Sequence, residues 1–135
     1  RNRMMEKRMG KLALLKEELQ EPDFIGPEEF ATLLIGWGSL KGPLSEAVEL
    51  MNKGSGEKYA ALVFGDVWPL PEKLLREKAQ KAKHIVNVEQ NYTGQLAQLV
   101  REATGIVCEG SVLKYDGRQL SAGEIAARLK GGKAE

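Results

Sequence analysis

The sequence has very little of the material from which metal centres and nucleophilic active sites are built. It contains one Cys, Cys108, and one His, His84. A disulfide framework, a cysteine-rich zinc site and an iron–sulfur cluster held within the chain each require several such ligands, so these classes are excluded. We interpret Cys108 as a buried or inert thiol and His84 as a structural residue at the start of a strand. We therefore expect no metal in this chain.

The chain also lacks an excess of charge and any long apolar run. Twenty Lys and Arg side chains oppose nineteen Asp and Glu, which leaves a formal net charge of +1. Such a balance gives no field that attracts nucleic acid or an anionic membrane, so we expect neither as a partner. No stretch approaches the ~18 consecutive apolar residues of a membrane-spanning helix, and no apolar signal-peptide core stands near the beginning, so we expect a cytoplasmic protein. With 135 residues, the chain is long enough for one domain with its own core.

The first 30 residues differ in character from the rest. From Met5 to Leu19, apolar residues recur at steps of three or four without an interrupting Pro, which predicts an amphipathic helix. Basic residues come first and acidic ones follow, so the simplest interpretation is a solvated helix face and an acidic connector; the alternative is a connector to a preceding domain. Because the sequence begins with Arg1 rather than Met, we expect a piece of a longer protein. The residues of the expected apolar face are Met5, Met9, Leu12, Leu15 and Leu19.

Beyond residue 30, short apolar runs alternate with amphipathic stretches. Strands separated by helices of about 10–15 residues imply right-handed crossovers and a mainly parallel sheet covered on both faces, so the fold class is three-layer α/β. We assign 1–30 to the linker helix and acidic connector, and 31–135 to the α/β domain. The expected strands are 31–35, 59–64, 84–89 and 112–115. The expected helices are 43–54, 71–82, about 94–105, and a last one that begins at a capping box of Ser121 and Glu124.

Ligands in such sheets bind at the carboxyl ends of the strands, which here means the loops after the first three strands. The first loop offers a weak candidate anion site at Gly36, Gly38 and Ser39. Backbone N–H groups and a helix N-terminus in this context can hold a phosphate. The glycine spacing differs from the dinucleotide-binding pattern, however, and the Walker pattern is absent. A tight strand-to-helix turn, with Ser39 as its cap, is therefore the favoured interpretation.

The other two loops carry large or polar side chains. Trp68 in the second loop either docks against another domain or plugs the end of the sheet. In the third loop, Glu89 could act as a general acid or base, but no His, Cys or Lys lies beside it in sequence to complete a catalytic set. The amides and the hydroxyl of residues 89–95 more often cap a helix or form hydrogen bonds between domains. We therefore expect no catalytic residue.

Four segments, taken in order, resemble the alpha subunit of the 2-oxoacid:ferredoxin oxidoreductases, and most of all its 2-oxoglutarate type: 35–39, 68–71, 88–96 and 113–118. The run Glu-Gln-Asn-x-x-Gly-Gln-Leu within the third segment is the most specific part. Residues 7–15 are similar to the linker helix of that subunit. The resemblance implies a C-terminal domain like that of transketolase, with a mixed five-stranded sheet between helices.

The resemblance also implies what surrounds the domain. Such enzymes convert a 2-oxoacid and CoA into acyl-CoA, CO2 and reduced ferredoxin, and their thiamine diphosphate, Mg and iron–sulfur clusters lie in other domains. The expected partners are the preceding pyrimidine-binding domain of the same subunit, the beta subunit and, through the parent complex, ferredoxin and CoA. This domain is expected to serve assembly and to be inactive alone; the alternative is a small phosphate-, nucleotide- or CoA-binding module. The residues expected at its interfaces are Trp37, Trp68, Glu89, Gln90, Asn91 and Gln95.

Overall fold

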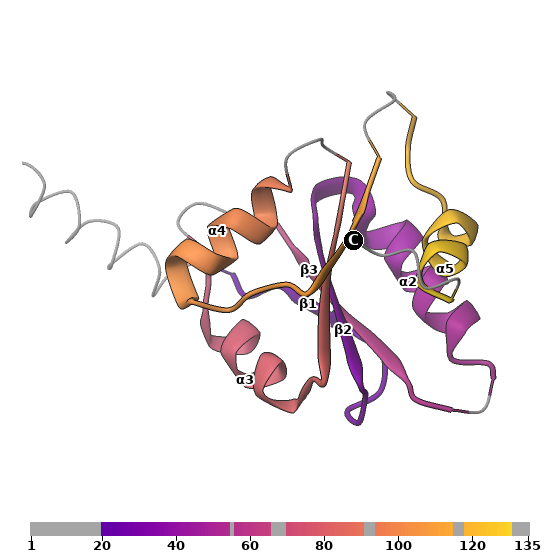
Figure 1. Cartoon of the computed structure of the whole chain (residues 1–135), viewed down its shortest axis with the longest axis horizontal. Helices are drawn as coiled ribbons and strands as arrows, with labels where there is room; N and C mark the ends of the chain where they lie inside the picture. The colour runs from indigo at the N-terminus through magenta and orange to yellow at the C-terminus, as the bar shows by residue number, and fades with distance from the viewer. Residues whose placement is uncertain (1–19, 55, 66–69, 91–93, 115–117, 131–135) are drawn as a thin grey trace, which may run out of the picture.

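A sheet of five strands runs through the computed structural model, with helices against both of its faces (Figure 1). The structure describes residues 20–54, 56–65, 70–90, 94–114 and 118–130. The strands are β1 (Asp23–Ile25), β2 (Thr32–Trp37), β3 (Tyr59–Phe64), β4 (His84–Glu89) and β5 (Gly110–Leu113), in the spatial order β1-β3-β2-β4-β5. The helices are the short 3-10 helix η1 (Gly38–Leu40), α2 (Lys41–Met51), α3 (Lys73–Lys81), α4 (Gln95–Thr104) and α5 (Ala122–Lys130).

The sheet is mainly parallel, as the alternation of strands and helices predicts. β2 lies at its centre and pairs in parallel with β3 and β4, and β4 pairs in parallel with β5. Of the described strands, only β1 runs antiparallel, along the outer edge of β3, with Phe24 opposite Leu62. β3 and β4 have their predicted bounds. β3 is a continuous apolar run, which is typical of a strand buried on both faces, whereas β4 also contains His84, Asn87 and Glu89. The expected mixed sheet and three-layer α/β class are thereby confirmed.

Other elements differ from their predicted bounds. β2 continues as far as Trp37, because Gly36 and Trp37 still pair with the end of β3. α2 begins at Lys41, before Pro43, since η1 leads into it without a break. β5 begins at Gly110 rather than at residue 112, and residue 115 lies outside the described residues.

β1 lies in a segment for which the sequence predicts only an acidic connector. Its three residues are exposed or half-buried, so periodicity gives no signal for a strand there. The strand forms because it pairs with β3, which would otherwise present an unpaired edge. The amphipathic helix predicted from Met5 to Leu19 lies outside the described residues.

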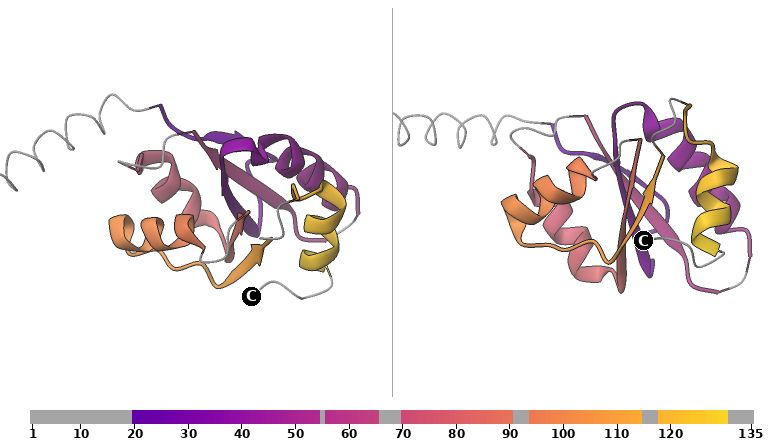
Figure 2. Two further views of the ribbon diagram at one scale, coloured as in Figure 1. Left: turned by 90° about the horizontal axis from the view of Figure 1, so that it is seen from above. Right: turned by 45° about the horizontal axis from the view of Figure 1, so that its top comes forward.

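The sheet separates two apolar cores, and helices lie on both of its faces (Figure 2). α2 and α5 pack on one face, and the predicted apolar stripe of α2, which includes Leu44 and Val48, is buried throughout. α3 and α4 pack on the other face, where Leu75 and Val100 are buried. Lys78 of α3 breaks the apolar pattern, because it is a charged residue that is only 5% exposed as a whole.

The ends of two helices follow the signals in the sequence. α4 begins after Gly94 and ends before Gly105, and both have a left-handed φ, of 65° and 78°, which Gly adopts readily. The predicted capping box starts α5: the Glu124 N–H donates to Ser121 Oγ at 3.1 Å, and the Ser121 N–H donates to Glu124 Oε1 at 3.3 Å. In the part of the chain that the structure describes, no helix has the length and apolar character needed to cross a membrane.

Candidate functional site

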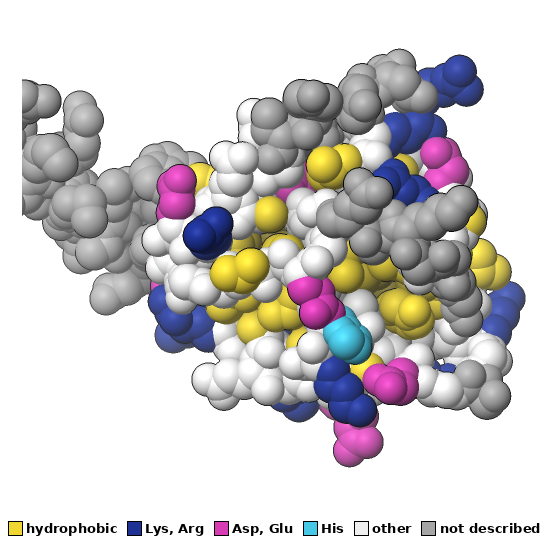
Figure 3. Space-filling view, in the orientation of Figure 1, with side chains coloured by type: hydrophobic (Ala, Val, Ile, Leu, Met, Phe, Trp, Pro, Cys, Tyr) yellow, Lys and Arg dark blue, Asp and Glu magenta, His cyan; other side chains and the backbone are white. Residues whose placement is uncertain are grey.

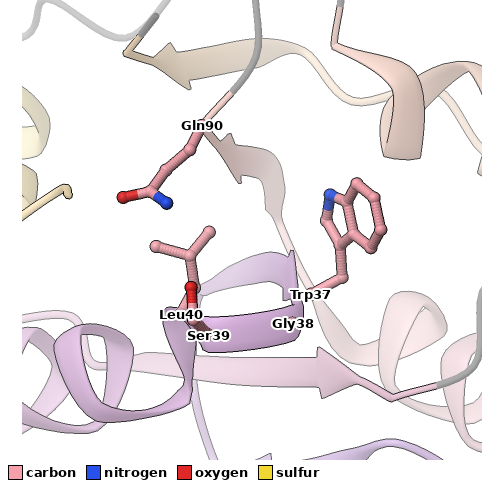
Figure 4. Close-up of a pocket in the computed structure, with 5 residues that line it drawn as sticks. All are labelled: Trp37, Gly38, Ser39, Leu40 and Gln90. Carbon is pink, nitrogen blue, oxygen red and sulfur yellow. The ribbon is translucent and has the colours of Figure 1, made fainter. Parts of the chain in front are cut away.

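The candidate residues that the structure describes gather at the carboxyl edge of the sheet. The loops after β2 and β4 meet there around a pocket of about 230 Å³ (Figure 4). The Trp37 indole stands on one side and the Gln90 amide on the other, above Leu40, and Gly38 and Ser39 complete the lining. Trp37 is half-buried and packs against the core beneath α3 and α4, whereas Gln90 is exposed. Two of the three predicted loops thus face one pocket.

The three residues of the glycine loop have different roles. Gly36 is buried inside β2, where a Cβ atom would come within 2.5 Å of Leu44 Cδ1, so it allows α2 to pack closely on the sheet. Gly38 has a left-handed φ of 68° and open space around it. The expected cap at Ser39 is wrong: neither η1 nor α2 has a side-chain cap, because the two are continuous and their N-cap positions fall on apolar residues. Gly38 and Ser39 therefore form an exposed turn beside the pocket.

Glu89 is completely buried at the end of β4, and its carboxylate caps α4. Oε1 accepts the Leu96 N–H at 2.6 Å, and Oε2 accepts the Ala97 N–H at 3.2 Å. The Asn87 side-chain amide donates to Oε2 at 2.7 Å, and the Ser111 hydroxyl of β5 donates in turn to the Asn87 side-chain oxygen. The charge also lies at the positive end of the helix, which favours it. Glu89 therefore ties β4, β5 and α4 together.

Gly94 completes this arrangement at the start of α4. Besides its left-handed φ, a Cβ atom there would lie 3.4 Å from Asn87 Nδ2 and 3.7 Å from Glu89 Oε2. A glycine thus lets the helix approach the buried carboxylate closely. Because N–H donors surround the carboxylate, and because Glu89 does not line the pocket beside Trp37, the geometry favours the capping interpretation over a general acid or base.

The N-terminus of α3 is occupied in the same manner. Glu21, which precedes β1, accepts the Leu74 N–H through Oε1 at 2.7 Å. α2 differs, because its N-cap residue Leu40 gives no side-chain cap and, among the described residues, no carboxylate is found to accept a backbone N–H of its first turn. Helix N-termini at the carboxyl edge of a parallel sheet are the usual places for ligand anions. Of the helices that follow β2, β3 and β4, two therefore already hold a carboxylate of the chain itself.

Gln119 and Leu120 bridge the two loops of the pocket. The Gln90 side-chain oxygen accepts the Leu120 N–H, and Gln119 Nε2 donates to the Ser39 carbonyl oxygen at 3.4 Å. Sequence reasoning missed this bridge, and it also missed Glu21, because the partner N–H lies 53 residues away along the chain. No local pattern reports contacts of such separation.

The other predicted interface residues are described in part. Gln95 is exposed at the first position of α4. Trp68 and Asn91 lie outside the described residues. Their interface roles stay predictions, as does that of Gln90.

The thiol and the imidazole do not contribute to the pocket. Cys108 is half-buried, and burial raises the pKa of its thiol to about 12, with the Glu89 charge adding to the effect, so the thiol stays protonated and unreactive. His84 is exposed at the beginning of β4 and pairs with the Glu109 carboxylate (Figure 3). Across the described ranges, no three His, Cys, Asp or Glu side chains gather as metal ligands.

The fold of the chain is similar to that of a transketolase chain. A split-gene transketolase chain, from a structure described as an inactive beta4 tetramer, superposes with a TM-score of 0.58 over 78% of this chain and 39% of that chain. At 19% sequence identity, this likeness concerns the fold alone. A family model, pyruvate:ferredoxin oxidoreductase core domain II, matches residues 31–125. The chain belongs to this family, which confirms the resemblance carried by the loops.

Relatives of the chain are alpha subunits of 2-oxoacid:ferredoxin oxidoreductases. Subunit alpha of 2-oxoacid:ferredoxin oxidoreductase 2 from Aeropyrum pernix is 32% identical over 131 residues, which cover 94% of this chain and 20% of that protein. The chain thus spans about a fifth of the length of such relatives. The structure of the 2-oxoglutarate:ferredoxin oxidoreductase from Magnetococcus marinus with 2-oxoglutarate, coenzyme A and succinyl-CoA bound matches with a TM-score of 0.84 and 25% identity, over 96% of this chain and 23% of that chain.

Proposed function

We propose that this chain is the C-terminal domain of the alpha subunit of a thiamine-diphosphate-dependent 2-oxoacid:ferredoxin oxidoreductase of the 2-oxoglutarate type, located in the cytoplasm. The complete enzyme converts a 2-oxoacid and CoA into acyl-CoA and CO2, and passes the electrons through iron–sulfur clusters to ferredoxin. The family of the chain supports this enzyme class. The Magnetococcus marinus relative, whose structure holds 2-oxoglutarate, coenzyme A and succinyl-CoA, supports the choice of substrate.

Within this enzyme the domain serves assembly and is inactive by itself. The observation that carries the proposal is that Glu89, the acidic residue of the most specific motif, is buried and caps a helix. Its carboxylate thus stabilises the domain and is not presented to a substrate. The thiamine diphosphate, Mg and iron–sulfur clusters belong to other domains. A single Cys in the whole chain, and no cluster of three metal-ligating side chains among the described residues, support that placement.

The carboxyl edge around Trp37 and Gln90 is the contact surface. A half-buried indole offers apolar area and one N–H donor at little cost in conformational entropy, as interface anchors do. The partners of this surface are the preceding pyrimidine-binding domain of the same subunit and the beta subunit, and the assembled complex handles CoA and ferredoxin. Glu89 contributes indirectly, by fixing α4 and the loop before it. The further residues that we assign to the surface are Trp68, Asn91 and Gln95.

Co-expression of the complete alpha subunit with its beta subunit tests the assembly role. Gln90→Ala and Trp37→Phe should lower the yield of the complex in size-exclusion chromatography, while each assembled complex keeps its specific activity. Val107→Ala is the control, because this apolar side chain is 62% exposed in the loop before β5. Reduction of a viologen dye by the isolated domain, supplied with 2-oxoglutarate, CoA and thiamine diphosphate, would overturn the proposal.

A second candidate function is a small module for phosphate, a nucleotide or CoA. The feature that favours it is the uncapped beginning of α2 beside the turn of Gly38 and Ser39, next to the pocket of about 230 Å³. Calorimetric titration with millimolar CoA or nucleotide decides between the two. A flat titration without a thermal shift removes this candidate.

A further inference from the structure

The segment before β2 is attached to the domain at several separate points. At its beginning, Glu21 accepts the Leu74 N–H in the first turn of α3 at 2.7 Å. In its middle, β1 pairs with β3, and the Asp23 carboxylate lies 3.1 Å from Lys41 Nζ of α2. Three acidic residues of the expected connector, the third being Glu28, thus have partners in the body of the domain.

The last attachment is the buried amine of Lys78. Its side chain is only 7% exposed, and Nζ lies 2.9 Å from Glu28 Oε2 and 4.1 Å from the centre of the Phe24 ring. Burial of an ammonium group is costly unless it is paired, and here a carboxylate and the face of an aromatic ring compensate it. The hydrogen bond from Lys78 lowers the pKa of Glu28. Phe30 packs against Phe24 with ring centres 5.9 Å apart, which holds the ring under the amine.

The backbone of this segment is also shaped for close contact. Gly26 has a φ of +115°, and a Cβ atom there would come within 3.0 Å of the Ala60 Cα atom. Only a glycine lets the chain pass this close to β3. Pro22 and Pro27 fix φ on either side of β1 and so reduce the freedom of the segment further.

We propose that residues 21–30 form a docked bracket, which fixes the place and the direction in which the preceding chain joins the α/β domain. The bracket contacts α3 at two places: Glu21 accepts from the first turn, and Glu28 pairs with Lys78 in the second half of the helix. Between these contacts it pairs with the edge of β3. If residues 21–30 were a flexible acidic connector, the preceding chain could rotate freely relative to the α/β domain. The bracket instead fixes the orientation of the preceding chain relative to the domain, and this does not depend on the activity of the complete protein.

Hydrogen exchange measured on this chain tests the attachments. Lys78→Met keeps the aliphatic stem but removes the charge, so the β1 amides should exchange roughly tenfold faster. Glu21→Gln should raise the exchange rate of the Leu74 amide by a similar factor, because the bond loses its charged acceptor. Lys81→Met is the comparison variant on the same helix. Lys81 also pairs with Glu28, with Nζ 3.6 Å from the carboxylate, but its side chain is 45% exposed, and an exposed ion pair contributes little. Lys81→Met should therefore change both rates much less than Lys78→Met and Glu21→Gln do.

Spin labels test the direction. Gln20→Cys and Lys53→Cys place labels at two exposed positions, one at the start of the bracket and one beyond α2, in a Cys108→Ala background. The distance distribution between them should be narrow and should broaden with Lys78→Met. Unchanged exchange and an unchanged distribution in the Lys78 and Glu21 variants would overturn the bracket, as would equal effects of Lys81→Met. If Lys78→Met unfolds the domain, Glu21→Gln decides the matter by the same two measurements.

Discussion

Glu89→Gln keeps the shape of the buried cap while exchanging one carboxylate oxygen for an amide nitrogen. In the native protein Oε1 accepts from Leu96, whereas Oε2 accepts from both Ala97 and Asn87. An amide nitrogen in the place of Oε2 faces two donors. Rotation of the Asn87 amide relieves one of these contacts, because the Ser111 hydroxyl can then accept instead of donate. The Ala97 N–H is left without its acceptor.

The expected loss follows from these bonds. A hydrogen bond to a charged group contributes about 1.5–3 kcal/mol, and the favourable position at the helix N-terminus adds up to about 2 kcal/mol in a partly buried setting. The neutral amide avoids the desolvation of a buried charge, which offsets part of the loss. We expect the free energy of unfolding to fall by about 2–4 kcal/mol, a large share of the ~5–15 kcal/mol of a typical domain.

Urea titration followed by circular dichroism measures this loss as a lower midpoint at an unchanged slope. Glu102→Gln is the control, since this Glu is exposed on the same helix and its change should stay within about 0.5 kcal/mol. If Glu89→Gln is as stable as the natural protein, the carboxylate does not act as a cap. A loss of activity in the complete complex at unchanged stability would then point to acid–base chemistry at Glu89. Activities must be compared per folded complex, because the cap affects folding.

Three further changes test the remaining structural claims. Gly36→Ala places a methyl group 2.5 Å from a side chain of α2 and should lower the free energy of unfolding by about 1–3 kcal/mol. Gly42→Ala, in open space, should be neutral or stabilise the protein by up to about 1 kcal/mol. A Gly42→Ala variant less stable than Gly36→Ala would refute this. Cys108, with its pKa raised to about 12, should react with iodoacetamide only after denaturation, and rapid native labelling would contradict its burial. A hydrogen bond from Lys114 lowers the pKa of Glu124. The stabilisation that this pair gives is therefore fully present above the pKa of Glu124 in the unfolded chain, and it is lost as the pH falls through the lower pKa of the native state. Glu124→Gln should therefore flatten the acid side of the stability profile, and an unchanged acid side would count against the pair.

The fold could be predicted where a local pattern matches burial. β3 is a continuous apolar run, β4 combines the apolar Ile85, Val86 and Val88 with polar residues, and the stripe of α2 faces the core at every predicted position. β1 could not be predicted, because its place depends on pairing with β3 and not on its own residues. The buried Lys78 is a similar case: its amine lies in the interior only because Phe24 and Glu28 arrive from another segment.

The location of the site could be predicted from the sequence, but the residues that cap its helices could not. The topology of a parallel sheet brings the loops after β2 and β4 to one edge, and the pocket beside Trp37 lies there. The sequence favours Ser39 as a cap because its position precedes a helix, but the 3-10 turn joins that helix directly. The caps of α3 and α4 come from Glu21 and Glu89, which are distant from the N–H groups that they accept. Only the folded chain shows which acid meets which helix.

The carboxylates at the N-termini of α3 and α4 also determine which ligands these two helices do not bind. A phosphorylated metabolite that approaches either helix meets a negative charge where other sheets of this kind offer free N–H groups. These two helix N-termini are therefore not available to bind such an anion. A single change could therefore create an anion site: neutralising Glu21 would free the N-terminus of α3 at the edge where other sheets of this kind bind their ligands.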